Sequence, residues 1–165
     1  MANFSFDVVS EYDKAEMNNV FEQTKREIDS RYDFKGTSAN IEWLNSDKTG
    51  LKITGSSEWQ IDTIVDIVRK KLATRGQDQK VLDTSQQMIT SNLKTTLEVP
   101  FKQGLKQEDA KKLAKILREQ LPKAKSIIQG DAIRVSSSSK DELQQAMKLL
   151  KAQDFDFPIH FTNFR

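Results

Sequence analysis

The side chains in this sequence that could do chemistry are cationic and aromatic, not metal-ligating or nucleophilic. His160 is the only histidine, and there is no cysteine. Zinc and non-haem iron sites of the usual ligand sets are therefore not expected, and disulfides and cysteine nucleophiles are excluded. No glycine-rich loop matches a phosphate-binding loop or a dinucleotide fingerprint. We therefore expect no catalytic residue, no metal and no cofactor, and we predict that the protein is not an enzyme.

A run of four serines at 136–139 could supply a nucleophile. Serine is also a preferred helix N-cap, and Ser139 stands three residues before Glu142 at the start of an apolar-periodic segment. The spacing therefore predicts that this run ends a strand and caps a helix.

Three polar side chains of the C-terminal half could together bind a phosphate. Their neighbours in the chain alternate with them as apolar residues, which predicts that Lys102, Arg134 and His160 face the open side of a sheet. A guanidinium can hold a phosphate by two parallel N–H bonds, and an ammonium acts as a point charge. We expect an anion site here. The alternative is a solvated face whose cations only hinder aggregation.

The distribution of charge agrees with a site in that half. Residues 1–95 hold 13 Lys and Arg against 15 Asp and Glu, whereas residues 96–165 hold 13 against 9. A basic segment favours an anionic partner such as a nucleotide or RNA. Solvated lysines on helix faces would explain the same mild excess.

The segment SRYDFKG at 30–36 mixes aromatic and charged side chains. Arg31 and Phe34 could clamp a base between a guanidinium and a ring. The alternative is a packed turn between a helix and a strand, in which Tyr32 and Phe34 anchor the core.

Another cationic cluster comprises Arg69, Lys70, Lys71 and Arg75. Cations at the end of a helix complement its dipole, which explains the cluster without a ligand. A phosphate track is the alternative interpretation.

The elements that must position these residues follow from apolar spacing. Four segments repeat apolar residues at i, i+3, i+4 and i+7, which predicts helices at about 13–31, 58–75, 106–121 and 140–152. Alternating apolar and polar residues predict strands at about 4–8, 39–43, 51–54, 97–101, 127–128, 133–135 and 157–161.

This order of elements is a split βαβ unit written twice, which predicts an α+β protein of two tandem ferredoxin-like domains. Each domain would be an antiparallel sheet with two helices on one face. We expect domains at 1–90, including a polar connector from about 77, and at 91–165. The first copy lacks a convincing fourth strand, so a terminal strand could pair with the other domain's sheet.

The fold is also that of RNA-recognition modules, which stack bases on aromatic residues of the central strands. The outward positions of the corresponding strands are not aromatic in either copy: they are Lys52, Thr54, Arg134 and Ser136. Base stacking on the open sheet in that style is therefore not expected.

Nothing in the sequence indicates a membrane or secretory protein. No apolar run approaches the roughly 20 residues needed to span a bilayer. The N-terminus carries acidic residues early and lacks a basic segment followed by an apolar one. We expect a cytoplasmic protein without a membrane partner.

Several separate motifs resemble the YajQ family, in order and over essentially the whole chain. They are FDVVSE at 6–11, SRYDFKG at 30–36, KQG at 102–104, IQGDAIRV at 128–135 and FTNFR at 161–165.

The resemblance implies tandem ferredoxin-like domains and no established catalytic activity. It also implies binding of purine nucleotides such as GTP or ATP, or of tRNA, and for some members cyclic di-GMP sensing and transcriptional control. It assigns no ligand residues. The alternative function is a protein-interaction adaptor or transcription co-regulator that uses an exposed sheet or strand edge.

Overall fold

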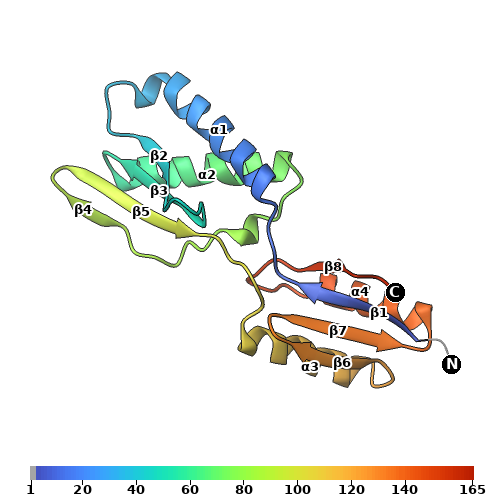
Figure 1. Ribbon diagram of the computed structural model, residues 1–165. Helices are drawn as coiled ribbons and strands as arrows, with labels where there is room; N and C mark the ends of the chain where they lie inside the picture. The colour runs from blue at the N-terminus through green and yellow to red at the C-terminus, as the bar shows by residue number, and fades with distance from the viewer. Residues whose placement is uncertain (1–2) are drawn as a thin grey trace. The chain divides into compact units, whose positions relative to one another are not determined.

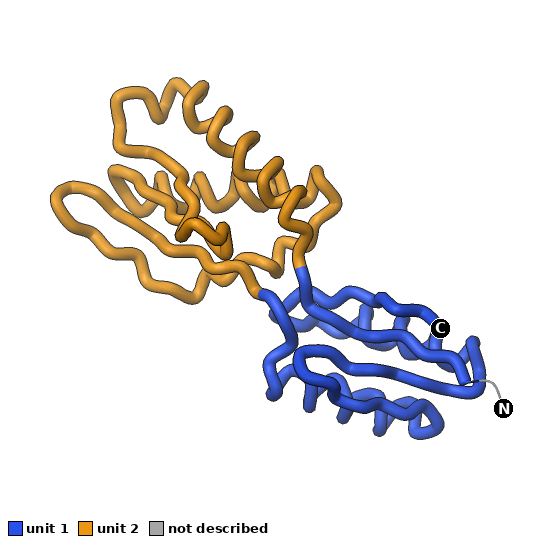
Figure 2. Tube along the Cα trace, viewed as in Figure 1, with its two compact units in different colours: residues 1–11, 103–165 blue, residues 12–102 orange. Residues whose placement is uncertain are grey.

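The computed structural model describes residues 3–165 and divides the chain into two compact units (Figure 2). The continuous unit comprises residues 12–102. The split unit comprises the N-terminal residues up to 11 together with residues 103–165.

The continuous unit is a four-stranded antiparallel sheet of order β2-β3-β5-β4, covered on one face by two helices (Figure 1). Facing side chains of the three longer strands form one buried row of Ile41, Ile53 and Leu97. Its elements are α1 (Lys14–Ser30), the short 3₁₀ helix η1 (Tyr32–Phe34), β2 (Asn40–Trp43), β3 (Gly50–Gly55), α2 (Glu58–Thr74), the 3₁₀ helix η2 (Gln79–Val81), β4 (Ile89–Ser91) and β5 (Lys94–Pro100).

The split unit repeats this architecture with the order β6-β7-β1-β8 and its own two helices on one face (Figure 1). The N-terminal strand lies inside this sheet, where Phe6 and Val8 are completely buried. Its elements are β1 (Phe4–Val9), α3 (Gln107–Gln120), β6 (Lys125–Gln129), β7 (Ala132–Ser137), α4 (Lys140–Ala152) and β8 (His160–Thr162).

The α+β class and the two ferredoxin-like sheets that the sequence predicted are confirmed. All four helices begin and end within about a residue of the expected bounds. Three of them are capped by side chains, because Asp13, Ser57 and the expected cap Ser139 accept hydrogen bonds from backbone N–H groups of the first turn. The serine run ends β7 and caps α4.

The division between the units differs from the expected boundary at 90. The strand of residues 94–100 pairs with β3 in the continuous unit, and β1 pairs with β7 and β8 in the split unit. Each sheet thereby obtains its fourth strand. The physical reason is that β1 and β5 carry similar alternating patterns, so their spacing alone does not decide which sheet each joins.

The strand β4 was not expected from the sequence. It forms a hairpin with β5 through Asn92 and Leu93, both at positive φ. Such turns usually contain glycine, and the absence of glycine at these two positions is why the hairpin was not predicted.

No helix within residues 3–165 combines the length and apolar character that crossing a membrane requires. Over the same residues, no group of three or more His, Cys, Asp or Glu side chains is placed to hold a metal ion.

Candidate anion-binding face

The open face of the split unit's sheet is where its polar strand residues meet. Because successive side chains of a strand point to opposite faces, the burial of Phe6 and Val8 places Asp7 on the side away from the helices. Asp7 lies opposite Arg134 on β7 and opposite Thr162 on β8. Residues far apart in the sequence thus form one row across the centre of the sheet.

Asp7 is the centre of a hydrogen-bond network on this face. Arg134 Nε donates to Asp7 Oδ1 at 3.1 Å, and Asn163 Nδ2 donates to Asp7 Oδ2 at 2.8 Å. The bond from Asn163, together with the charges of Arg134 and Arg165, holds the pKa of the Asp7 carboxyl below its usual range despite burial. Asp7 is therefore ionised at neutral pH and fixes the position of the guanidinium.

Arg134 remains able to bind a further anion. A guanidinium has five N–H donors, and the bond to Asp7 Oδ1 uses only the one on Nε. The side chain is 31% exposed. A carboxylate that holds one edge of the guanidinium orients its remaining donors, which suits bidentate recognition of a phosphate.

Further cationic and polar groups border this pair. His160 lies opposite Val9 at one end of the face, and Lys125 lies opposite Ser136 at the other. Arg165 is joined to the backbone of Ser5 by hydrogen bonds in both directions. Among the side chains of these strand and C-terminal residues, the cations outnumber the one carboxylate, that of Asp7.

The turn between β6 and β7 lies beside the segment that enters α3. Gly130 and Gly104 both have positive φ, and Leu105 N–H donates to Asp131 O at 3.1 Å. The φ of 80° at Gly104 favours glycine, and a Cβ there would also come within 3.1 Å of the Asp131 carboxylate, which would have to shift.

The structure places only two of the five candidate residues named from the sequence on this face. Arg134 and His160 lie on the open face of the split unit. Lys102 follows β5 in the continuous unit, where its N–H donates to Val81 O at 2.7 Å. Lys102 was expected on the same face because β5 was assigned to the wrong sheet.

Arg31 and Phe34 also lie in the continuous unit, where they contact each other. The Arg31 guanidinium lies 4.8 Å from the Phe34 ring centroid and makes two hydrogen bonds to Asp33, at 3.0 and 2.9 Å. Phe34 is buried, as the packed-turn alternative expects, but Tyr32 is 89% exposed and does not anchor the core. The guanidinium is already occupied by Asp33 and Phe34 from its own turn.

The cluster at 69–75 is largely paired with carboxylates of its own unit. Arg75 makes hydrogen bonds of 2.6 and 3.0 Å to Glu16, and Lys71 lies 3.0 Å from Glu27. These pairs join α2 to α1, so the cluster has a structural role that differs from the expected complementing of the helix dipole.

Sequence reasoning missed four residues of the face, namely Asp7, Lys125, Asn163 and Arg165. Asp7 was the polar residue between two apolar ones in the first strand, so alternation could have placed it on the open face. Its partners could not be found without knowing that β1 lies between β7 and β8.

Comparison with known proteins agrees with this architecture. Residues 4–165 match the family described as nucleotide-binding protein YajQ-like. Relatives named nucleotide-binding protein include those of Nocardioides sp. (42% identical) and Clavibacter michiganensis (43%), each aligned over 100% of both chains. The protein of that name from Trichodesmium erythraeum is 40% identical over 98% of this chain and 97% of its own length.

The resemblance drawn from the five motifs is thereby confirmed. The match covers the chain from β1 to the C-terminal residues of the open face, and identities near 40% extend over the full length. This chain belongs to the YajQ family.

Proposed function

We propose that this protein binds a nucleotide without transforming it, and that the phosphate binds on the open face of the split unit. The observation that carries the proposal is the Asp7–Arg134 pair, in which a carboxylate fixes a partly exposed guanidinium. Arg165 and Lys125 add positive charge on the same face, and the imidazole of His160 lies there too.

The related proteins are named for nucleotide binding, which supports the ligand class. Within that class, free purine nucleotides, cyclic di-GMP and the phosphates of tRNA share the anionic group that the arginine would grip. The proposal includes the absence of catalysis, since the names of the related proteins describe nucleotide binding alone. Nucleotide hydrolysis should therefore stay at the rate of a protein-free control.

Calorimetric titration with GTP, ATP, cyclic di-GMP and tRNA at 50 and 200 mM salt tests the proposal. Phosphate contacts release counterions, so the affinity of the true ligand should fall steeply as salt rises. Failure of all four ligands to bind at 50 mM salt would contradict the proposal.

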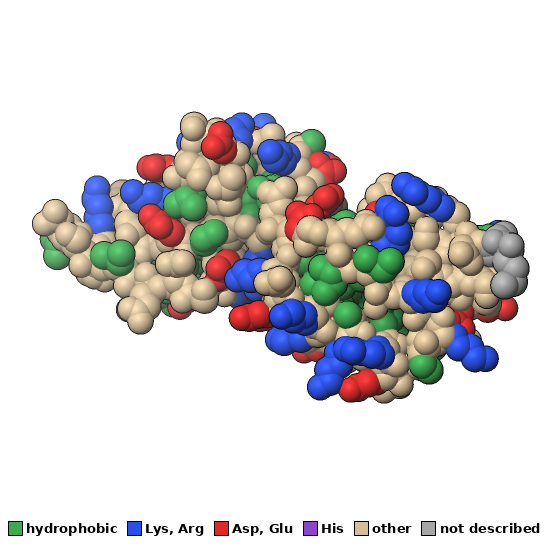
Figure 3. Space-filling model, turned by 60° about the horizontal axis from the view of Figure 1, so that its bottom comes forward, with side chains coloured by type: hydrophobic (Ala, Val, Ile, Leu, Met, Phe, Trp, Pro, Cys, Tyr) green, Lys and Arg blue, Asp and Glu red, His purple; other side chains and the backbone are tan. Residues whose placement is uncertain are grey.

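A second candidate function is protein binding at the strand edge β6. The strand lies at the edge of its sheet, and Ile127 and Ile128 are exposed on it. Figure 3 shows hydrophobic side chains on the split unit bordered by Lys and Arg. An extended peptide could add to this edge. Binding of such a peptide would depend on Ile127 and Ile128. Its affinity would fall less with rising salt than the affinity for a phosphate.

A further inference from the structure

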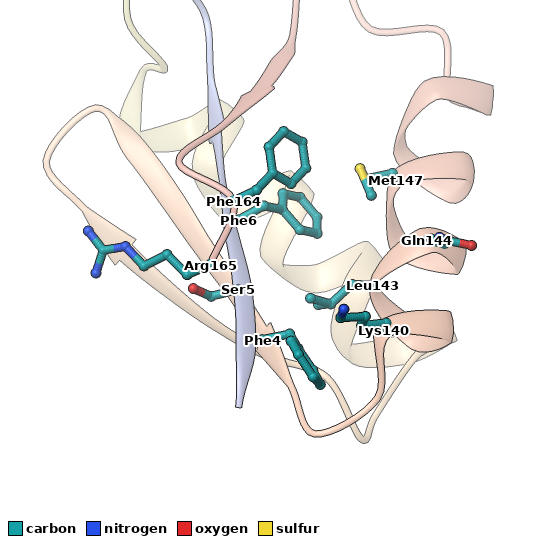
Figure 4. Close-up of a pocket in the computed structure, with 9 residues that line it drawn as sticks. All are labelled: Phe4, Ser5, Phe6, Lys140, Leu143, Gln144, Met147, Phe164 and Arg165. Carbon is teal, nitrogen blue, oxygen red and sulfur yellow. The ribbon is translucent and has the colours of Figure 1, made fainter. Parts of the chain in front are cut away.

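A pocket of about 360 Å³ opens between β1 and α4 of the split unit (Figure 4). Figure 4 shows Phe4, Phe6 and Phe164 on its strand side, with Leu143 and Met147 on its helix side. Its volume falls within the range of about 300–1,000 Å³ that is usual for small-molecule sites. Its walls are aromatic and aliphatic.

Phe164 stands out among these residues because it remains 63% exposed at the rim. Its ring centroid lies 6.2 Å from that of the buried Phe6, at an interplanar angle of 33°. Phe6 also makes an edge-to-face contact with Phe161, with ring centroids 5.3 Å apart. The Phe6 ring is thus fixed in the core, and the exposed Phe164 ring is available to a ligand.

The pocket also has a cation at its rim. The ammonium of Lys140 lies 4.9 Å from the centroid of the Phe4 ring. Lys140 is the first residue of α4, which Ser139 caps. It can donate hydrogen bonds to the polar edge of a flat ring that enters the pocket.

The C-terminal residues connect this pocket to the anion-binding face. Asn163 binds Asp7 on the open face, whereas Phe164 lines the pocket. Figure 4 shows Arg165 on the opposite side of β1 from the Phe164 ring. The edge formed by residues 163–165 therefore has an aromatic pocket on one side and cations on the other.

We propose that this pocket receives the base of the bound nucleotide, with the phosphate bent over the edge at 163–165 toward Arg165 and Arg134. The inference rests on the proposed function and adds where the base binds. The rings of Phe4 and Phe164 and the ammonium of Lys140 suit a flat heteroaromatic ring, because the two rings can stack on its faces and the ammonium can meet its polar edge. An uncharged acyl chain would use the apolar walls but would leave Lys140 without a role.

The test compares GTP with inorganic tripolyphosphate, which has the phosphates but no base. Phe164→Ala should weaken GTP binding about tenfold or more, the usual effect of losing a base–aromatic stack. It should leave tripolyphosphate affinity unchanged. Arg134→Ala should weaken both ligands. Trp59→Ala removes an exposed aromatic side chain from α2 of the other unit and should change neither affinity.

Phe164→Leu provides a second variant that keeps the pocket apolar while removing the aromatic face, so it too should weaken GTP binding. Saturation-transfer NMR should show stronger transfer to the base protons than to the ribose protons.

If Arg134→Ala weakens GTP binding and both Phe164 variants bind it like the parent, the pocket assignment is overturned and the proposed function stands. If the parent binds tripolyphosphate as tightly as GTP, the base has no site and the pocket assignment is likewise overturned. If the parent binds none of GTP, ATP, cyclic di-GMP, tRNA and tripolyphosphate, both proposals fail.

Discussion

Asp7 links the stability of the split unit to pH through its contacts with Asn163 and Arg134. Its pKa is lower in the folded protein than in the unfolded chain, where an aspartate has a value of about 3.9. The network therefore stabilises the fold fully above that value and loses its effect as pH falls through the lowered folded pKa.

Asp7→Asn should accordingly lower the melting temperature at pH 7, because Arg134 loses its ionic partner on the sheet. The difference between variant and parent should shrink as pH falls, and should vanish once Asp7 is protonated in both states. Thermal unfolding followed by circular dichroism from pH 7 to 2 measures this. A difference that stays constant over the whole range would show that the carboxylate charge does not stabilise the fold.

At the residue scale, alternation along single strands predicted that Arg134 and His160 lie on an open face. It could not pair Arg134 with Asp7, because these residues are 127 positions apart and meet only through the pairing of β1 with β7. The role of Arg165 was hidden for the same reason, since it depends on backbone bonds to Ser5.

At the scale of elements, the β4–β5 hairpin carries local strain. Leu93 has φ of 66° and is 92% exposed, so its side chain contributes no packing that would offset the unfavourable backbone conformation. A left-handed conformation costs a residue with a Cβ about 1–2 kcal/mol.

Leu93→Gly should therefore stabilise the protein by about 1 kcal/mol, measured by urea unfolding, because glycine adopts this conformation freely and Asn-Gly is the preferred pair for such a turn. Leu93→Ala keeps the Cβ and serves as the control, which should give little or no gain. Equal stabilisation by both variants would show that exposure of the leucine, and not its backbone conformation, is the unfavourable feature.

The helices were predictable because each carries its apolar stripe and most carry a capping residue within one short segment. Which sheet each strand joins could not be predicted, because strand pairing depends on partners that are distant in the sequence. Lys102 was misplaced for this reason. The alternation of the strand before it was read correctly, but that strand was expected in the sheet of the C-terminal half and instead pairs with β3.

At the scale of the whole molecule, the chain enters the continuous unit near residue 12 and leaves it near residue 102. We expect residues 12–102 to fold alone, since they contain a complete sheet, two helices and a separate core. Residues 103–165 alone should not fold, because they lack the strand that contributes the buried Phe6 and Val8. Circular dichroism and amide NMR dispersion of the two fragments measure this.

A third fragment, which restores β1 to the split unit, provides the control for that prediction. Gly104 N–H donates to Ser10 O, so the two points where the chain passes between the units are adjacent within the split unit. Residues 1–11 joined to 103–165 by a short glycine linker should therefore fold. Native-like spectra for 103–165 alone would contradict the essential role of β1.

The central claim is that Arg134 on the open face binds the phosphate of a nucleotide. Calorimetric titration of GTP into the parent, Arg134→Ala and Arg69→Ala tests it most directly, because both variants remove one arginine and only Arg134 lies on the proposed face. Losing a charge-assisted hydrogen bond costs about 1.5–3 kcal/mol, so Arg134→Ala should weaken binding about tenfold or more. Arg134→Lys, which keeps the charge on the face, should lose less, and Arg69→Ala should bind like the parent. If Arg134→Ala binds GTP like the parent while Arg69→Ala does not, the site lies on α2 and the assignment to the open face is wrong.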